Sequence, residues 1–435
     1  MPDWPVKTLA AGAAALLFAG CSQPAPEPED PTTTSPPPAT TEPAAPPQGL
    51  APVTVEVPDG MDAAPFDTPR TAEVPPGWTM SVWARVPEAR LAQWLPDDTL
   101  LISRPDAGEV IRLTRDGDAA QPSVLLDGLT QPHGLDFRDD TLYVAESNQV
   151  SAYPYADGRL GEPRVVAGDL PDARSPDLRG AYSHALKSVA VGPDRRVYFS
   201  IGSTGNISAE DRDATPPRAT VMTVAPEGGP AQPWATGVRN GTGLAIAPDG
   251  SLWTANNGRD NVARPSDGQV VQEYVTDNPP EQMARLFEGR ELGWPYCNPE
   301  GGPSNLPLIN DAQTNPDGAL MDCAALPAIE QSFPAHSAPL GLAFTDAVLP
   351  APYESGALVG VHGSWNASPP RAPEVSFFPW TSGKLGPRQT LVGGFQSEDG
   401  SRWGRPVAAV DGPDGAVYVT DDDAGAVYRL APPGR

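Results

Sequence analysis

The residues of this chain that could do chemistry stand mostly just before short apolar strands. Arg239 and Asn240 precede the run "GTGLAIAPDG", and a second polar cluster, Asn256 to Asp260, follows the next apolar run. Comparable places before apolar runs are held by His133, His184, His336 and Arg405. Imidazole exchanges protons near neutral pH, and guanidinium binds carboxylates. Each of these residues, taken alone, could be structural; Arg239, for example, could form a salt bridge with one of the many carboxylates. Their shared place before apolar runs indicates a common site.

These residues recur at one place in a repeated unit. Each unit has a short strand, an Asp-rich turn and a β-rich strand, as in "LAQWLPDDTLLISRPDAGEVIRL", "HGLDFRDDTLYVAESNQVSAY", "KSVAVGPDRRVYFSIG" and "TGLAIAPDGSLWTANN". Two further units are "LGLAFTDAVLPAPYESGALVGVHGSW" and "PVAAVDGPDGAVYVTDDDAGAVYRL". Sheets that bury their faces only against neighbouring sheets predict an all-β fold, a six-bladed β-propeller. A pair of β-sandwiches, the main alternative, does not require the turn to recur at the same place.

Propeller geometry places these residues and closes the ring. The innermost strands line a central channel, and loops at its end gather residues from distant parts of the sequence, so the polar residues are expected at the channel mouth. Closure requires one terminus to supply a strand to the sheet of the other, since an edge would otherwise stay unpaired. The segment "WTMSVWARV", residues 78–86, is expected to join the sheet that contains "AVYVTDD".

Composition limits the classes of function. A chain of 435 residues can form one large all-β domain or two ordinary ones, and its 56 prolines and 43 glycines indicate many turns and few helices. The formal net charge is −26, and lysine occurs only at Lys7, Lys187 and Lys384. Such a chain has no basic stripe to offset a phosphate backbone, which argues against nucleic acid as a partner.

The N-terminal residues indicate export. Lys7 precedes the apolar run "TLAAGAAALLFAG", which is too short to span a bilayer, and Cys21 follows the small residues Ala19 and Gly20. Residues 1–21 therefore resemble a bacterial lipoprotein signal with Cys21 lipidated; an ordinary secretory signal with a chance cysteine is the alternative. Residues 22–74, rich in Pro, Thr and Ala, are expected to be a disordered linker to the folded domain, residues 75–435. The protein is predicted to be a cell-envelope lipoprotein, held at the membrane only by its lipid.

Two cysteines remain in the predicted folded domain. Cys297 and Cys323 would lie where disulfides persist if the chain is exported, so they are expected to pair and to staple the long loop between them. Two buried free thiols are the alternative. A metal site on two cysteines without a neighbouring histidine is disfavoured.

Several motifs, in a fixed order, carry a resemblance to a known family. They are "HALKSVAVGPDRRVYFSIGSTGNIS", "GVRNGTGLAIAPDGSLWTANNGRDN", "ELGWPYC", "AHSAPLGLAF", "HGSWN" and "WGRPVAAVDGPDGAVYVTDDDAGAVYRL". From about Pro75 to Pro432 the chain resembles the glucose/sorbosone dehydrogenase family, soluble propeller enzymes that use pyrroloquinoline quinone (PQQ). The resemblance implies PQQ-dependent oxidation of an aldose, a sorbosone-like sugar or a related polyol, with electrons passing to an external acceptor.

The resemblance also implies roles for individual residues. PQQ carries three carboxylates, so its site needs cations and a flat packing surface. The resemblance assigns cofactor contacts to Arg104, Arg239, Asn240, Trp294, His336 and Arg405. Trp294 could equally be a core anchor. The general base of the family corresponds to His184, and Ser183 stands where glucose-oxidising members have an Asp. Either another carboxylate orients His184, or the rate and the substrate differ.

Calcium is implied at the cofactor, where it would polarise the quinone carbonyl. The family supplies backbone carbonyls from the loop before "GWP", which here would come from Asn278, Pro279 and Pro280, with Asp277 beside them and Glu281 at a matching acidic position. A plain surface loop is the alternative. Two other functions stay open for the whole chain, a calcium-dependent propeller lactonase and a non-catalytic binding lipoprotein.

Overall fold

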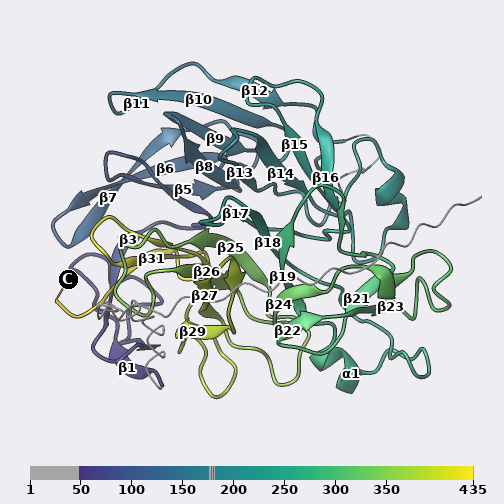
Figure 1. Ribbon diagram of the computed structural model, residues 1–435. Helices are drawn as coiled ribbons and strands as arrows, with labels where there is room; N and C mark the ends of the chain where they lie inside the picture. The colour runs from purple at the N-terminus through teal and green to yellow at the C-terminus, as the bar shows by residue number, and fades with distance from the viewer. Residues whose placement is uncertain (1–48, 176–177, 179, 181, 435) are drawn as a thin grey trace, which may run out of the picture. The chain divides into compact units, whose positions relative to one another are not determined.

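The computed structural model describes residues 49–175, 178, 180 and 182–434. The predicted signal peptide, Cys21 and linker residues 22–48 lie outside this part. Six antiparallel sheets follow one another along the chain and pack face to face around a common axis (Figure 1). They coincide with the six predicted units, so the all-β, six-bladed propeller is confirmed.

Each blade begins with a strand at the centre of the ring and continues outward. The first two blades contain β4 (Ala92–Trp94), β5 (Leu100–Arg104), β6 (Glu109–Asp116) and β7 (Ala119–Leu126), then β8 (Gly134–Arg138), β9 (Thr141–Ala145), β10 (Val150–Ala156), β11 (Arg159–Leu160) and β12 (Arg164–Ala167). The third contains β13 (Val189–Val191), β14 (Val197–Ile201), β15 (Thr220–Val224) and β16 (Gln232–Thr236), with β20 (Arg290–Glu291) added in parallel.

The last three blades follow the same plan. The fourth contains β17 (Gly243–Ile246), β18 (Leu252–Asn256), β19 (Glu281–Leu286), β24 (Ile329–Phe333) and β22 (Ser304–Leu306). The fifth contains β25 (Pro339–Phe344), β26 (Gly356–Val361), β27 (Glu374–Thr381), β28 (Lys384–Leu385) and β29 (Gln389–Val392). The sixth contains β30 (Pro406–Asp411), β31 (Val417–Asp421), β32 (Ala426–Ala431) and β3 (Thr79–Arg85).

The recurring turn has a local cause. In the third, fourth and sixth blades an aspartate carboxylate accepts the backbone N–H two positions ahead: Asp194 from Arg196, Asp249 from Ser251 and Asp414 from Ala416. This side-chain bond closes the turn and leaves the flanking β-branched residues to form strands. The repeated Pro-Asp pair in the sequence is therefore the signature of the turn between the first two strands of a blade.

The inner strands pack closely around the axis. A Cβ on Gly243 would lie 2.5 Å from the carbonyl oxygen of Leu340, and one on Gly341 would lie 2.6 Å from Cβ of Ala408, so neighbouring inner strands approach more closely than a side chain permits. The cavity that they enclose has a volume of about 240 Å³ and is lined by residues of all six inner strands.

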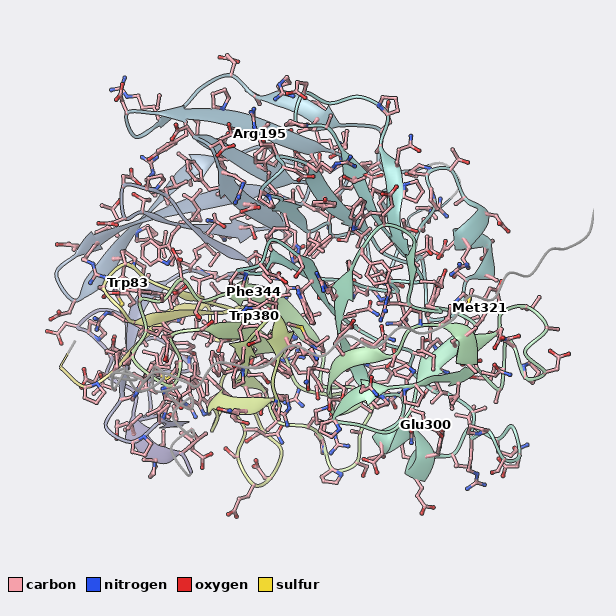
Figure 2. The ribbon with its side chains drawn as sticks, viewed as in Figure 1. Trp83, Arg195, Glu300, Met321, Phe344 and Trp380 are labelled. Atoms are coloured by element: carbon pink, nitrogen blue, oxygen red, sulfur yellow. A yellow bond between two sulfur atoms is a disulfide. The ribbon has the colours of Figure 1, made fainter. Side chains whose placement is uncertain are left out.

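The ring closes as the sequence predicts. Strand β3 pairs antiparallel with β32 in the sheet that also holds β31. Trp83 of β3 is fully buried, and its ring centroid lies 4.6 Å from that of Tyr418 on β31 (Figure 2). The N-terminal strand thus seals the last blade with both hydrogen bonds and apolar packing.

The predicted linker, residues 22–74, is wrong in its second half. Strands β1 (Ala51–Thr54) and β2 (Thr71–Val74) form a small sheet, and Val55, Phe66 and Val74 are buried in an apolar core shared by the fifth and sixth blades. The physical reason is the alternating run "APVTVEV", whose β-branched residues find apolar partners in the propeller. The ordered region therefore begins well before residue 75.

An insertion, residues 287–328 between β19 and β24, interrupts the fourth blade. It contains β21 (Cys297–Pro299), β23 (Leu308–Asn310) and a 3-10 turn, η2 (Cys323–Ala325). The predicted disulfide is confirmed: Cys297 and Cys323 are joined, with Cα atoms 5.7 Å apart. The remaining helical pieces are α1 (Gln272–Asp277) and the 3-10 turn η1 (Ala209–Asp213). Among the described residues, no helix has the length and apolar character needed to cross a membrane.

Candidate active site

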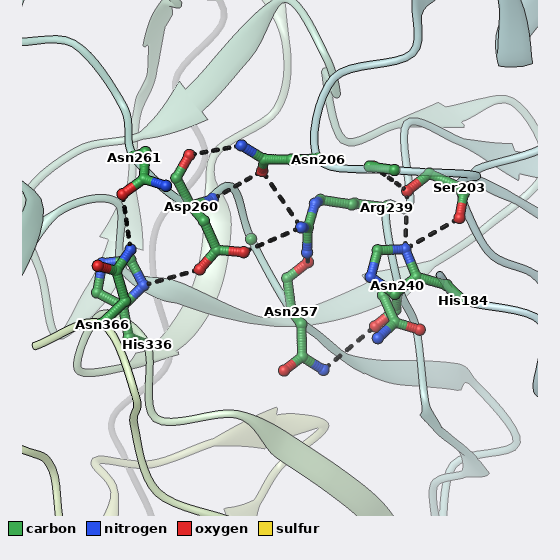
Figure 3. Close-up of polar contacts among 12 residues, drawn as sticks. His184, Ser203, Asn206, Arg239, Asn240, Asn257, Asp260, Asn261, His336 and Asn366 are labelled. Carbon is green, nitrogen blue, oxygen red and sulfur yellow. Dashed lines mark hydrogen bonds and ion pairs between the residues drawn. The ribbon is translucent and has the colours of Figure 1, made fainter. Parts of the chain in front are cut away.

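The loops that enter three consecutive inner strands bring four of the predicted residues together. His184 precedes β13, Arg239 and Asn240 precede β17, and His336 precedes β25. Figure 3 shows them in one polar cluster, although up to 152 positions separate them in sequence. The prediction that these residues converge is confirmed for this set.

Arg239 is held by an ion pair whose partner the sequence analysis did not identify. It is buried, and its Nη2 lies 3.2 Å from Oδ2 of Asp260 and 3.2 Å from Oδ1 of Asn206 (Figure 3). Burial lowers the pKa of its guanidinium, against the opposing effect of Asp260. Its Nε is buried and has no hydrogen-bond partner among the described residues. The salt-bridge role foreseen for Arg239 is therefore real, and the side chain still offers one unsatisfied donor.

Asp260 connects this arginine to His336. Its Oδ1 lies 3.4 Å from Nδ1 of His336, whose Nε2 contacts the carbonyl oxygen of Val275 at 2.6 Å. Burial opposes the protonation of His336, but the bonds to Asp260 and Val275 outweigh it and raise its pKa. Burial would also raise the pKa of Asp260, yet the neighbouring His336 and Arg239 keep it below its ordinary value. The cluster thus stabilises the Asp260 carboxylate between the guanidinium of Arg239 and the imidazole of His336.

His184 has the opposite electrostatic character. Burial, followed by the charge of Arg239, lowers its pKa to about 3, so the ring is neutral at physiological pH. Its Nδ1 lies 3.0 Å from the carbonyl oxygen of Ser203 and 2.9 Å from the Ser203 hydroxyl. Because a carbonyl only accepts, Nδ1 carries the proton and Nε2 carries the lone pair. The described residues give Nε2 no hydrogen-bond partner, so this atom can accept a proton.

The structure shows which groups orient His184 when Ser183, and not an Asp, precedes it. No carboxylate bonds to His184 among the described residues; the Ser203 carbonyl and hydroxyl orient the ring instead, and the hydroxyl is itself fixed by donation to the carbonyl of Gly205 at 2.8 Å. The ring therefore has a defined tautomer but lacks a directly bonded anion that would strengthen it as a base.

The loop predicted to bind calcium does not form a metal site by its side chains. Asn278 donates from Nδ2 to the carbonyl of Tyr274, and Pro279 and Pro280 are buried. Glu281 accepts the N–H of Gly258, and burial raises its pKa to about 7. The described part of the chain contains no group of three or more His, Cys, Asp or Glu side chains suited to a metal. The side chains present do not fit a calcium ion, and the carbonyl ligands stay a prediction.

Arg405 lies in a separate cavity of about 420 Å³. Its Nε donates to the carbonyl of His362, whose Nε2 lies 2.7 Å from Oδ1 of Asp422, and Asp422 also pairs with Arg90 at 2.7 Å. Leu186, close behind His184 in the chain, lines the same cavity. No direct contact links Arg405 to the Arg239 cluster among the described contacts.

Two other predicted cofactor residues have structural partners. Arg104 donates to the carbonyl of Pro87 and pairs with Glu109 at 2.7 Å, and the contacts of the described residues include no bond from it to the Arg239 cluster. Trp294 is buried, and its Nε1 donates to the carbonyl of Asn206 at 3.1 Å. This contact supports the residue that holds Arg239, in agreement with the core-anchor alternative for Trp294.

Sequence reasoning missed several members of the mouth. Asp260 and Asn206 were visible inside quoted motifs, but nothing local marks them as partners of Arg239. His362 and Asp422 form an imidazole–carboxylate pair, although 60 positions separate them in the sequence. Trp365, in the motif "HGSWN", is 74% exposed, the largest exposure among the large apolar side chains of the described residues, and the adjacent Asn366 bonds Asn261 beside Asp260.

Comparison with known proteins assigns the chain to a class and then to a family. The fold is that of six-bladed propellers described as sugar dehydrogenases. The PQQ domain of pyranose dehydrogenase from Coprinopsis cinerea, in its holo form, has a TM-score of 0.69 and 20% identity, over 83% of this chain and 97% of that one. Residues 72–432 match the TrAA12-like family model, and the chain belongs to this family.

Three further similarities agree. A calcium structure of Trichoderma reesei carbohydrate-active enzyme family AA12 has a TM-score of 0.67 and 19% identity, over 82% of this chain and 96% of that one. The PQQ-bound aldose sugar dehydrogenase of Streptomyces coelicolor has a TM-score of 0.54 and 15% identity, over 82% and 99%. An uncharacterized protein of Borreliella burgdorferi is 25% identical over 320 residues, 69% of this chain and 76% of that protein. The resemblance drawn from the motifs is thereby confirmed.

Proposed function

We propose that this chain is a PQQ-dependent dehydrogenase that oxidises a sugar or related polyol at the propeller mouth and passes the electrons to an external acceptor. The observation that carries the proposal is the neutral His184, with an unpartnered Nε2, in one cluster with Arg239 and Asn240. A hydroxyl proton can move to Nε2 as the carbinol carbon is oxidised, which is the step for which general base catalysis is needed.

The residues present fit a carboxylated quinone. Arg239 has a buried Nε without a partner, and the side-chain amide of Asn240 makes no hydrogen bond among the described contacts. Arg405 uses only its Nε in a described bond, which leaves its terminal nitrogens for an anion. Charge-assisted bonds from Arg239 and Asn240 would hold cofactor carboxylates, and Arg405 would take part only if one quinone reaches from this cluster into the cavity of Arg405. When bound, the quinone supplies the two-electron acceptor, and this chain orients it and takes up the proton.

The low pKa of His184 has a consequence for this role. Since its pKa is near 3, the imidazole stays neutral over the whole physiological pH range and keeps the lone pair on Nε2, but the same low pKa makes the ring a weak base. Arg239 disfavours the imidazolium, whereas Asp260 favours it. The balance between these two charges therefore controls how readily Nε2 takes the substrate proton.

We also propose that the chain is exported and anchored through a lipid on Cys21. The support is the motif "LFAGC" and the Cys297–Cys323 disulfide, because disulfides persist in oxidising compartments. Metabolic labelling with a fatty acid should mark the wild-type protein and fail to mark Cys21→Ser. Equal labelling of both would refute the anchor.

Reconstitution tests the enzymatic proposal. Purified protein with PQQ and calcium is expected to reduce a redox dye when a panel of neutral aldoses and polyols is supplied. Protein without PQQ is the control. Absence of PQQ binding by the wild-type protein would overturn the proposal, and hydrolysis of a lactone without PQQ would favour a hydrolase instead.

A further inference from the structure

The insertion bridged by Cys297 and Cys323 is tied to the mouth through one buried carboxylate. Asp311 is 1% exposed and follows strand β23. Its Oδ2 accepts from Arg259 Nη1 and from Asn298 Nδ2, each at 2.7 Å. Its Oδ1 accepts from the backbone N–H groups of Gln313 and Thr314, each at 2.9 Å. Asp311 therefore fixes both strands of the insertion and one residue outside it.

The residue outside the insertion is the immediate neighbour of Asp260. Arg259 is 2% exposed, and besides Asp311 it reaches Oε1 of Gln313 at 2.7 Å. Both bonds of this guanidinium therefore end on the insertion. The next residue, Asp260, carries the bonds to Arg239 and His336. The position of the peptide between Arg259 and Asp260 thus depends on contacts made some 50 positions further along the chain.

The pair is unusual for a purely stabilising contact. The side chains of Arg259 and Asp311 are 1% and 0% exposed, and removing two charges from water costs much of what their attraction returns. Such a pair fixes geometry more effectively than it adds stability, because the rigid guanidinium directs Nη1 to Asp311 and Nη2 to Gln313 at the same time. The geometry fixed here is that of the strip that carries Asp260.

We propose that Asp311 is a positioning residue for the mouth: through Arg259 it places Asp260, and the Cys297–Cys323 disulfide holds Asp311 in turn. Cys297 directly precedes Asn298, and Cys323 lies against Asn315, whose N–H donates to the carbonyl of Asp311. The insertion therefore fixes the position of Asp260, and with it the Arg239–Asp260–His336 cluster, through its contacts with Arg259. Its effect on cofactor affinity rests on the proposed function, whereas its effect on Asp260 does not.

The test compares Asp311→Asn with Asp317→Asn in protein without quinone. Asp317 is an exposed carboxylate of the same insertion that caps the N–H of Ala319, so it controls for a change of charge. The readout is the NMR titration of the His336 ring, which senses Asp260 directly. Asp311→Asn should lower the pKa of His336, while Asp317→Asn should leave it unchanged. An unchanged His336 titration in folded Asp311→Asn would overturn the proposal.

A second variant covers the case in which Asp311→Asn fails to fold. Replacing both Cys297 and Cys323 by serine keeps every charge and should shift the His336 titration in the same direction. PQQ binding, measured by quenching of tryptophan fluorescence, should weaken about tenfold or more in both variants, because small displacements of positioning groups have large effects. If wild-type protein binds no PQQ, the proposed function fails, and the His336 titration still decides the role of Asp311.

Discussion

The two histidine–carboxylate pairs of the mouth differ in the direction in which the pKa of the imidazole is shifted, although both place the ring beside an aspartate and an arginine. His336 pairs with Asp260 and also bonds a backbone carbonyl, and its pKa is raised. His362 pairs with Asp422 at a shorter distance, yet burial, together with Arg405 and Arg90, lowers its pKa. The distance to a carboxylate alone therefore does not determine the charge of a histidine; burial and the remaining partners do.

His184 completes the comparison, since its ring has no directly bonded carboxylate and is the one placed to accept a proton. Its neutral form follows from burial and from Arg239. A mouth that lowers the pKa of one imidazole and raises that of another, within a single cluster, places proton acceptance and charge compensation on different rings. This separation is typical of catalytic sites, where environments push the pKa values of similar groups apart.

The largest effect on stability is expected from Asp260→Asn. The substitution leaves the buried Arg239 without its carboxylate, and breaking such a pair destabilises a protein by about 3 kcal/mol or more. Urea denaturation should show the decrease in the free energy of unfolding. A loss equal to that of an exposed pair, for example in Asp267→Asn beside Arg264, would show that the buried pair has no special weight.

A smaller effect is expected from Asp422→Asn, because the side chain of Arg90 is 16% exposed, against 6% for Arg239, and so keeps more contact with water when its carboxylate is lost. The interactions of Asp422, chiefly its hydrogen bond to His362, lower its pKa from 3.8 to about 2 against the effect of burial. A carboxylate with a lowered pKa stabilises the fold fully above pH 3.8 and loses that contribution as the pH falls toward 2, about 2 kcal/mol in total. Asp422→Asn should abolish this part of the acid dependence of unfolding. An unchanged acid dependence would contradict the assignment.

The sequence predicted the blades and the place of the site residues better than it predicted which side chains pair with one another. The six units and the convergence of His184, Arg239, Asn240 and His336 follow from periodicity and from the place of each residue before an inner strand. The closing strand β3 follows from the need to pair the edge of the last blade, and the disulfide from two cysteines in a chain expected to be exported. Asp260 could not be identified as the bridge, because an ion pair between loops depends on how blades are rotated against one another. For the same reason Trp294 gave no sign of its partner, Asn206. Arg104 differs, because it pairs with Glu109 directly opposite it on the neighbouring strand of its own blade.

The four histidines permit a direct check of the electrostatic comparison. Burial lowers the pKa of His133 and of His184 to about 3, His362 is also lowered, and His336 alone is raised. NMR titration should therefore show a single ring that titrates above pH 6.5. Because the folded pKa of His336 is raised, its stabilising contribution is complete below pH 6.5 and declines as the pH rises through that pKa. Two or more rings titrating above 6.5 would break the comparison.

The smallest effect is expected from Ser203→Ala. The variant removes the hydroxyl that contacts Nδ1 of His184 but keeps the carbonyl, so the tautomer is preserved. The ring loses one hydrogen bond that orients it, which contributes about 1 kcal/mol. Turnover with PQQ should fall by less than about tenfold, with PQQ affinity unchanged. A hundredfold loss would show that the hydroxyl, and not the carbonyl, sets the position of the ring.

The central claim is that Nε2 of His184 accepts the substrate proton while the arginines hold the cofactor. The most direct measurement is the steady-state rate of PQQ-dependent sugar oxidation by His184→Ala at saturating PQQ, with PQQ affinity determined in parallel. We expect a rate at least about a hundredfold below that of the wild-type protein and an affinity close to normal. A wild-type rate in His184→Ala at saturating PQQ would contradict the account.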